Sequence, residues 1–301
     1  MFELDNPTSL QQISLPIFSE NKVEVLMKRE DLIDSEISGN KWRKLKYNLL
    51  EAQDQGYSTI LTFGGAYSNH IAATAAACKR YGFKSIGIIR GDELNAQSNT
   101  TLEQAAANGM DLQFISRAAY QNRSDVTWLQ TLTKKHEAFI VPEGGTNALA
   151  LRGVQELVDE ITVDFDTILC PVGTGGTFSG IVNGIKDHQR AIGISSLKGA
   201  KYLEDLIGEL TTASSSWELI HDYHFGGYAK FDSHLIKFIN QFYLETQIPL
   251  DPIYTGKMMY GLIDMLKKGK IPSSSRLICV HTGGLQGIIG FNQLHNDLLK
   301  I

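Results

Sequence analysis

Short apolar runs alternate with helical patterns along almost the whole chain. The runs "VEVLMKRE" (23–30), "STILTFGG" (58–65) and "KSIGIIRG" (84–91) have the length and composition of buried strands. The stretches "KWRKLKYNLLEAQDQGY" (41–57) and "SNHIAATAAACKRYG" (68–82) between them have the spacing of helices that stop at glycine. The N-terminal part of the chain therefore predicts strands that alternate with helices.

The same alternation continues to the C-terminus. Further strands are predicted at 111–116, 138–145, 166–173, 191–197 and 276–284, and further helices at 101–110, 126–136, 148–161, 178–188, 233–247, 257–269 and 285–299. Strands joined by helices form parallel sheets that are covered on both faces. The pattern predicts an α/β protein with open, twisted, mostly parallel sheets flanked by helices. The least regular stretch, 208–230, predicts a loop, either near a ligand or on the surface.

Composition and charge narrow the class of protein. The 301 residues are 43% hydrophobic and 20% charged, which is typical of a globular protein with one large domain or two ordinary ones. The net charge of -5 and the lack of a basic block argue against nucleic acid as a partner. No apolar run reaches about 18 residues, so no membrane span is expected. The first residues lack a signal-peptide pattern, and the expected location is the cytoplasm.

The cysteines predict no special chemistry. Cys78, Cys170 and Cys279 lie among apolar or small residues, their number is odd, and no CxxC spacing occurs. Buried, reduced thiols are expected. Histidines and carboxylates show no spacing such as HExxH, so no metal is expected.

Glycine-rich stretches follow several predicted strands. They are "TFGGAYSNH" (62–70), "VPEGGTN" (141–147), "CPVGTGGTFSG" (170–180) and "VHTGG" (280–284). Open α/β sheets bind ligands beyond the carboxyl ends of their strands. A single such loop is often structural, but the recurrence favours one shared ligand site.

The stretch "GTGGT" (173–177) predicts a phosphate site. It leaves a strand and opens a helix, where backbone N–H groups and the helix dipole attract anions. No lysine follows the glycines, which excludes a Walker loop. The last glycine of a dinucleotide fingerprint is replaced by Phe178, so the stretch indicates a monophosphate.

Lys41 stands at the predicted start of a helix, after the polar turn Ser38-Gly39-Asn40. Most lysines are solvated surface cations, and that interpretation applies to Lys41 as well. The combination of a lysine, a monophosphate turn and an asparagine in a glycine-rich turn instead suggests pyridoxal 5′-phosphate. That cofactor needs an amine for its Schiff base and an anchor for its phosphate.

Motifs along nearly the whole chain carry a resemblance to a known family. "SGNKWRKL" (38–45), "YSNH" (67–70), "GTGGT", "DPIYTGKMMYGL" (251–262) and "VHTGG" occur in this order. They resemble the 1-aminocyclopropane-1-carboxylate (ACC) deaminases and D-cysteine desulfhydrases. These are fold-type-II pyridoxal-phosphate enzymes related to the tryptophan synthase β-subunit.

The resemblance also implies an architecture. It implies a homodimer and two domains, a large one from residues 1–44 and 147–301 and a small one from residues 45–146. The cofactor is expected in the cleft between them.

The resemblance implies roles for the cofactor residues. Lys41 resembles the Schiff-base lysine that later removes the Cα proton, and Lys44 a residue near the phosphate. Asn69 resembles the partner of the ring hydroxyl, and Thr282 that of the ring nitrogen. The expected phosphate cradle consists of Gly173, Thr174, Gly175, Gly176 and Thr177. Lys44 could equally be an exposed cation, and Thr282 a residue that satisfies its own turn.

The resemblance also implies substrate contacts. Ser68 resembles the serine near the substrate carboxylate, with Asn69 and His70 beside it, and Tyr228 and Tyr254 resemble two catalytic tyrosines. Ser68 and Asn69 would also suit a helix N-cap, and His70 the first helical turn. The tyrosines could be core residues with one satisfied hydroxyl. Thr146 lies in another glycine-rich loop that relatives place near the substrate.

The substrate is inferred from Thr255 and Thr282, where ACC deaminases carry glutamate and leucine. Neutral hydroxyls there match the desulfhydrase pattern and favour a weaker electron sink, which suffices to expel a thiolate. The expected activity is β-elimination from a small D-amino acid, with D-cysteine giving pyruvate, ammonia and sulfide. The alternatives are an ACC deaminase that forms α-ketobutyrate, a pyridoxal-phosphate binder without activity, and an α/β protein whose glycines serve another phosphate.

Overall fold

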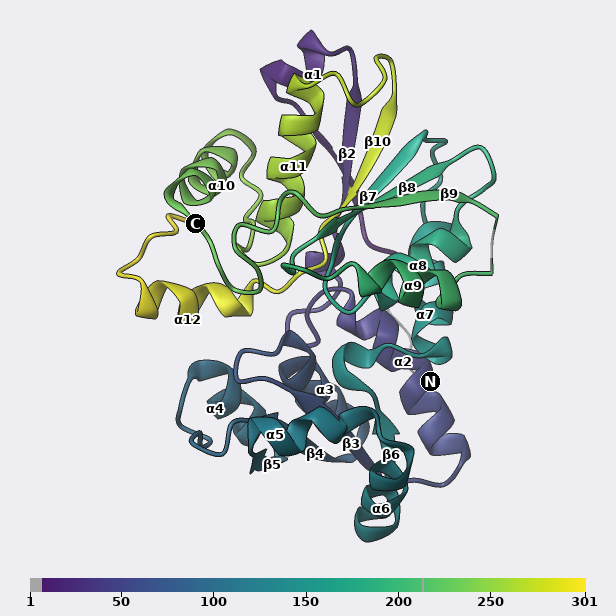
Figure 1. The fold of residues 1–301 in the computed structure, drawn as a ribbon, viewed down its shortest axis with the longest axis vertical. Coiled ribbons are helices and arrows are strands. Elements are labelled where there is room, and N and C mark those ends of the chain that lie inside the picture. The colour runs from purple at the N-terminus through teal and green to yellow at the C-terminus, as the bar shows by residue number, and fades with distance from the viewer. Residues whose placement is uncertain (1–6, 213) are drawn as a thin grey trace.

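Two sheets organise the chain in the computed structural model, which describes residues 7–212 and 214–301 (Figure 1). The larger sheet has six strands in the order β1-β2-β10-β7-β8-β9. β1 pairs antiparallel with β2, and all other pairs in this sheet are parallel. The strands are β1 (Leu10–Ile13), β2 (Glu24–Lys28), β7 (Thr167–Val172), β8 (Arg190–Ser195), β9 (Ser216–Ile220) and β10 (Arg276–Val280).

The smaller sheet has four parallel strands in the order β5-β4-β3-β6 and occupies the lower half of Figure 1. Its strands are β3 (Thr59–Gly64), β4 (Lys84–Arg90), β5 (Met110–Ile115) and β6 (Ala138–Val141). Together the two sheets confirm the predicted α/β fold class. The predicted domain limits stay a prediction, and helix α2 (Lys41–Asp54) runs unbroken across the limit at residue 44.

Helices cover both faces of the larger sheet. On β7, Ile168, Cys170 and Val172 face one core, while Leu169 faces the other. Strands buried on both faces read as continuous apolar runs, which is why β7 was predictable. One face packs on α7 (Ala148–Asp159), α8 (Gly176–Gly184) and α9 (Tyr202–Leu210), and the other on α1 (Pro16–Glu20), α10 (Ser233–Thr246) and α11 (Thr255–Lys267).

The smaller sheet is covered in the same way. Ile60 of β3 packs on one face and its neighbour Leu61 on the other. The helices of the first face are α2, α3 (Asn69–Tyr81) and α4 (Thr100–Ala107), and those of the second are α5 (Arg117–Tyr120) and α6 (Val126–His136). Helix α12 (Gln286–Leu294) follows β10. No helix among the described residues is both long and apolar enough to cross a membrane.

A buried ion network anchors α2. Arg43 is 1% exposed, and its Nε donates to Glu30 Oε2 at 3.0 Å while its Nη1 donates to Glu160 Oε1 at 2.6 Å. The buried Lys28 of β2 also pairs with Glu160. Charges are tolerated in a protein interior when they are paired and hydrogen-bonded. The network therefore joins the start of α2 to β2 and to the end of α7. Its central residue, Arg43, lies two positions after Lys41.

The structure corrects the interpretation of 208–230 as a loop only in part, because residues 221–230 carry no helix or strand and include Tyr228. This stretch contains the end of α9 and the edge strand β9, which pairs with β8. The sequence pattern did not predict β1, α1 or α9, and the strand predicted at 276–284 ends at Val280. The cysteines are free and buried, as predicted. Burial raises the pKa of the Cys78 and Cys170 thiols to about 12.

Candidate active site

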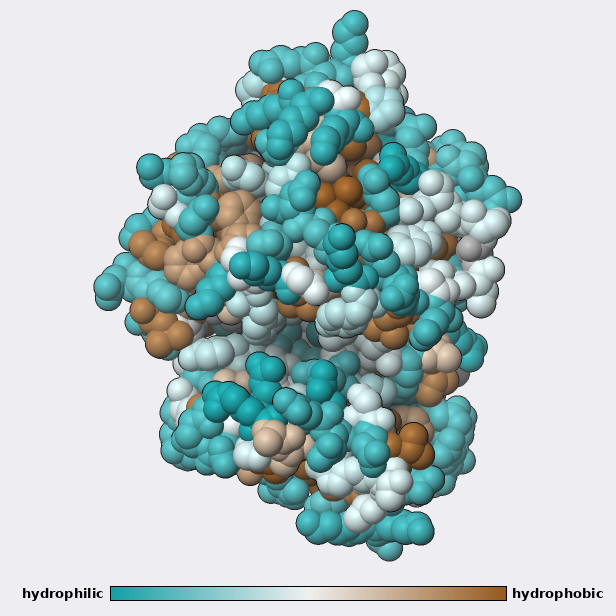
Figure 2. All heavy atoms as spheres, viewed as in Figure 1, coloured by the Kyte–Doolittle hydropathy of each residue, from teal (hydrophilic) through white to brown (hydrophobic). Residues whose placement is uncertain are grey.

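The glycine-rich loops that follow the strands of the two sheets meet one another. The exits of β6 and β7 touch through Thr146 and Thr174, whose Oγ1 atoms lie 2.8 Å apart. The exit of β10 touches the loop before α2, because Asn40 N donates to Thr282 O at 3.2 Å. Figure 2 shows the surface hollowed between the part over the larger sheet and the part over the smaller one. The predicted shared site is therefore assembled between the sheets.

Lys41 is the first residue of α2 and is joined to the phosphate turn through Asn40. Its Nζ donates to Asn40 Oδ1 at 2.8 Å, and Asn40 Nδ2 donates to Thr177 Oγ1 at 2.6 Å. Among the described residues, no carboxylate forms an ion pair with Lys41. Loss of hydration on burial lowers the pKa of Lys41 to about 8. Its side chain is only partly buried, so the amine can act as a nucleophile near neutral pH.

Close packing around the phosphate turn requires glycine. Gly175 has φ +84°, and Gly176 begins α8. A Cβ at Gly176 would lie 2.7 Å from Thr146 Oγ1, and one at Gly173 would lie 3.0 Å from the Tyr254 ring. The first turn of α8 can thus present its backbone N–H groups to an anion with no side chain between.

Lys44 is buried beside this turn. It is 2% exposed, and its Nζ donates to Gly144 O at 2.9 Å. A Cβ at Gly144 would lie 2.8 Å from the Thr174 side chain. Gly144 therefore lies between Lys44 and the phosphate turn. Burial, followed by the charge of Lys41, holds the pKa of Lys44 well below its usual value. The expectation of an exposed cation is wrong.

His70 is a buried residue in the first turn of α3. Its Nε2 lies 2.8 Å from Thr62 Oγ1, and the Thr62 hydroxyl donates to Val141 O at 2.8 Å. Thr62 therefore accepts from a protonated Nε2, and the buried Nδ1 has no hydrogen-bond partner among the described residues. Burial and then the charges of Lys41 and Lys44 lower the pKa of His70, so the ring is neutral.

Ser68 and Asn69 mark the start of α3. Ser68 is its N-cap and accepts from Ile71 N at 3.3 Å, which leaves the hydroxyl proton free to donate. Asn69 Oδ1 accepts from Gln286 Nε2 at 2.6 Å. No motif in the sequence indicates this contact. A Cβ at Gly284 would lie 2.6 Å from Asn69 Nδ2. Asn69 is thus placed beside the "HTGG" turn.

Tyr254 and Tyr228 lie together, with ring centroids 6.3 Å apart and an interplanar angle of 63°. Asp251 fixes the turn of Tyr254, because its Oδ1 accepts from Ile253 N and Tyr254 N at 2.8 Å. Loss of hydration and then the neighbouring Tyr228 raise the pKa of Tyr254 well above its usual value. Tyr228 is 42% exposed, but the loss of hydration around its phenol still raises its pKa. Both phenols therefore keep their protons at neutral pH.

The two threonines used to infer the substrate differ in environment. Thr255 is fully buried, and its hydroxyl donates to Asp251 Oδ2 at 2.6 Å. Thr282 is partly exposed next to the loop before α2. A Cβ at Gly39, which has φ +67°, would lie 2.1 Å from Thr282 O, so only glycine allows this approach.

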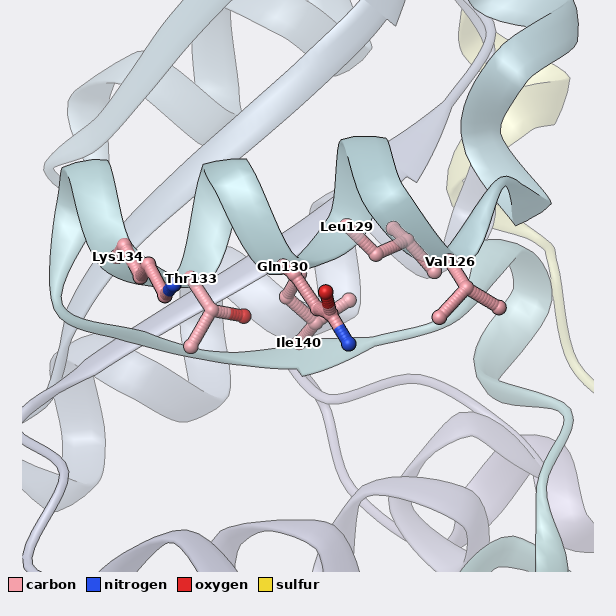
Figure 3. A pocket seen from close by; sticks show the side chains of 6 residues that line it. All are labelled: Val126, Leu129, Gln130, Thr133, Lys134 and Ile140. Carbon is pink, nitrogen blue, oxygen red and sulfur yellow. The ribbon is translucent and has the colours of Figure 1, made fainter.

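A pocket on the smaller sheet is separate from this site. It has a volume of about 310 Å³, lies against α6 and β6, and contains none of the candidate residues (Figure 3). Its lining residues are Val126, Leu129, Gln130, Thr133, Lys134 and Ile140.

The residues of the main site fit pyridoxal phosphate. The partly buried amine of Lys41 has a neutral partner, the glycine turn opens α8 toward an anion, and Asn69 keeps Nδ2 for an oxygen acceptor. These are the amine, the phosphate anchor and the polar contact that the cofactor needs. The site therefore suits the cofactor indicated by the sequence.

Comparison with known proteins also points to a pyridoxal-phosphate enzyme. The family described as "Pyridoxal-phosphate dependent enzyme" matches residues 2–283. An Arabidopsis thaliana protein named as a mitochondrial bifunctional D-cysteine desulfhydrase/1-aminocyclopropane-1-carboxylate deaminase is 31% identical, over 94% of this chain and 77% of that protein. A D-cysteine desulfhydrase of Salmonella paratyphi A is 26% identical over 89% of each chain.

A crystal structure described as an ACC deaminase homologue superimposes with a TM-score of 0.85 at 26% identity, covering 98% of this chain and 95% of that one. The chain therefore belongs to the fold-type-II pyridoxal-phosphate-dependent enzymes, within the ACC deaminase and D-cysteine desulfhydrase family, and its cofactor is pyridoxal 5′-phosphate.

Proposed function

We propose that this enzyme catalyses β-elimination from a small D-amino acid, with D-cysteine as the favoured substrate. One observation carries the proposal, namely the neutral hydroxyls of Thr255 and Thr282. The family resemblance implies glutamate and leucine at these positions in ACC deaminases. D-cysteine and water would give pyruvate, ammonia and sulfide. A thiolate is a stabilised leaving group, so its expulsion needs a weaker electron sink than opening a cyclopropane ring.

The cofactor would be held by Lys41, by the turn from Gly173 to Thr177 and by Asn69, with Lys44 near the phosphate and Thr282 near the ring nitrogen. When bound, pyridoxal phosphate supplies the electron-withdrawing system that makes the substrate Cα proton acidic. The partly buried Lys41 Nζ is suited to accept that proton, because its lowered pKa leaves much of the amine neutral near pH 8.

Three side chains would serve the substrate itself. Ser68 can donate its hydroxyl proton to the substrate carboxylate, and the positive end of α3 adds to this attraction. Tyr254 keeps its proton and can donate it to the departing sulfur, with Tyr228 beside it. His70 and Thr146 would complete the wall of the site from the exits of β3 and β6.

The amine of Lys41 is expected to titrate near pH 8 in the cofactor-free protein. Only the neutral amine is nucleophilic, so its rate of reaction with added pyridoxal phosphate should rise with pH and level off above about pH 8. Stopped-flow absorbance across pH 6–10 measures this rate. A rate that still rises tenfold per pH unit beyond pH 9 would show an ordinary, solvated lysine.

A paired assay tests the substrate. We expect sulfide from D-cysteine at a kcat/KM at least about 100-fold above that for α-ketobutyrate formation from ACC, equivalent to about 2.7 kcal/mol of transition-state discrimination. L-cysteine serves as the stereochemical control. Faster α-ketobutyrate formation would assign the chain to the deaminases, and inactivity with every amino acid tested would favour a cofactor-binding protein without activity.

ACC deamination is the second candidate function, because the Arabidopsis relative bears both names. The homodimer and the cytoplasmic location stay predictions. Sedimentation of the cofactor-loaded protein would test the first of them.

A further inference from the structure

The segment of residues 223–228 lies along one face of α11. Lys257, Gly261 and Asp264 are one and two helical turns apart, so their side chains share that face. Asp264 Oδ2 accepts from Tyr223 Oη at 2.7 Å, and a Cβ at Gly261 would lie 2.8 Å from the Tyr223 ring. The segment is therefore packed directly on the helix that begins after Tyr254.

Aromatic contacts extend this packing. The Phe225 ring meets Tyr260 of α11 edge-on, with centroids 4.9 Å apart at 84°. The backbone of the segment is unusual, because Phe225 has φ 52° and Ala229 has φ 55°, on either side of Tyr228. Left-handed backbone is uncommon at residues other than glycine and persists where neighbouring contacts enforce it. Something must hold these turns in place.

Lys257 provides that contact. It is 0% exposed, and its Nζ donates to His224 O at 2.9 Å and to Gly227 O at 2.8 Å. Within the described part of the chain, no carboxylate forms an ion pair with it. Each of the two carbonyls begins a turn, since Gly227 N donates to His224 O and Lys230 N donates to Gly227 O. One ammonium group thus joins two consecutive turns, and Tyr228 lies in the second.

We propose that Lys257 is a positioning residue for the reaction, which acts by holding the turn that places Tyr228 beside Tyr254. This inference rests on the proposed role of the two tyrosines. Asp251 fixes Tyr254 at the start of α11, and Lys257 fixes Tyr228 from the next turn of the same helix. The relative position of the two phenols is then set by one rigid helix, and the segment is a fixed wall of the site instead of a lid.

Hydrogen exchange of the cofactor-loaded protein tests the clamp without any assay of activity. In Lys257→Met we expect the amides of Gly227 and Lys230 to exchange at least about tenfold faster, since buried charge-assisted bonds are lost. Lys257→Arg, which keeps the donors, should stay within about threefold of wild type. Lys267→Met, on the exposed end of the same helix, is the matched control and should be unchanged. Unchanged exchange in Lys257→Met would overturn the proposal.

A double-mutant cycle tests the link to Tyr228. With D-cysteine, Lys257→Met is expected to lower kcat by about tenfold and to leave cofactor loading intact. In a Tyr228→Phe background, which lacks the phenolic hydroxyl, the same change should cost less than about twofold. Multiplicative losses would show that Lys257 acts elsewhere and would overturn the proposal.

The test of Lys257 does not depend on the folding of one variant or on activity with D-cysteine. If Lys257→Met does not fold, Lys257→Gln takes its place. Its side chain is shorter and uncharged and cannot reach both carbonyls, so wild-type exchange in that variant counts against the clamp. If the wild-type enzyme does not turn over D-cysteine, the proposed function fails, while the exchange experiment still decides whether Lys257 holds the segment.

Discussion

Lys41→Ala is expected to lower the rate of sulfide formation from D-cysteine by at least about 10³-fold, since general-base catalysis alone contributes about 10²–10⁴-fold. The partly buried amine has no carboxylate partner within the described residues, and the loss of its hydration lowers its pKa to about 8. Among the described residues, Lys41 is the lysine whose amine bonds Asn40, the partner of Thr177 in the glycine turn. Borohydride should also no longer fix the cofactor to the peptide that contains residue 41, as read by mass spectrometry.

Lys46→Ala is the matched control for this experiment. Lys46 lies on the same helix but forms a partly exposed ion pair with Glu156. Exposed pairs contribute about 0–1 kcal/mol, so turnover should stay within about twofold of wild type. Normal turnover by Lys41→Ala, or a borohydride label on another lysine, would rule out the proposed role of Lys41.

The second large effect concerns stability. Arg43→Ala is expected to lower the free energy of unfolding by about 3–5 kcal/mol, because it leaves the buried Glu30 without a compensating charge. Urea unfolding, followed at a fixed concentration of pyridoxal phosphate, measures the change. Because Arg43 lies two residues after Lys41, cofactor affinity should fall as well.

An exposed arginine provides the comparison. Arg80 pairs with Asp34 near the surface, and Arg80→Ala should lower the free energy of unfolding by no more than about 1 kcal/mol. A loss below about 1 kcal/mol for Arg43→Ala would contradict the prediction, because removal of one partner should leave an uncompensated buried charge.

The central strands and most helices were predictable because burial leaves a strong pattern in the sequence. β7 is apolar throughout since both of its faces are covered, and the long helices α10 and α11 carry clear apolar stripes. The missed strands β1 and β9 lie at the edges of the sheet, where only part of each side chain is covered. Such strands lack the apolar signal, and their pairing depends on neighbours far away in the chain.

The candidate site residues that belong to sequence motifs could be predicted. The contacts between segments far apart in the chain could not. Lys41 and the Gly173–Thr177 turn stand out in the sequence, and their place together between the sheets follows the resemblance. Gln286 bonds a residue 217 positions away, and Lys257 bonds carbonyls about 30 positions away, which no local pattern reveals. One signal was present, because Lys257 is a charge within an apolar helical stretch, "TGKMMYGL".

The place of β10 in the larger sheet determines when the enzyme can be completed. β10 lies between β2 and β7, although it is the last strand of the sheet to leave the ribosome. The first two strands must therefore wait for almost the entire chain, while the four strands of the smaller sheet can pair much earlier during synthesis. A nascent chain stalled before residue 276 should expose the antiparallel pair of β1 and β2 to proteases and chaperones, and it should be unable to mature into the active enzyme.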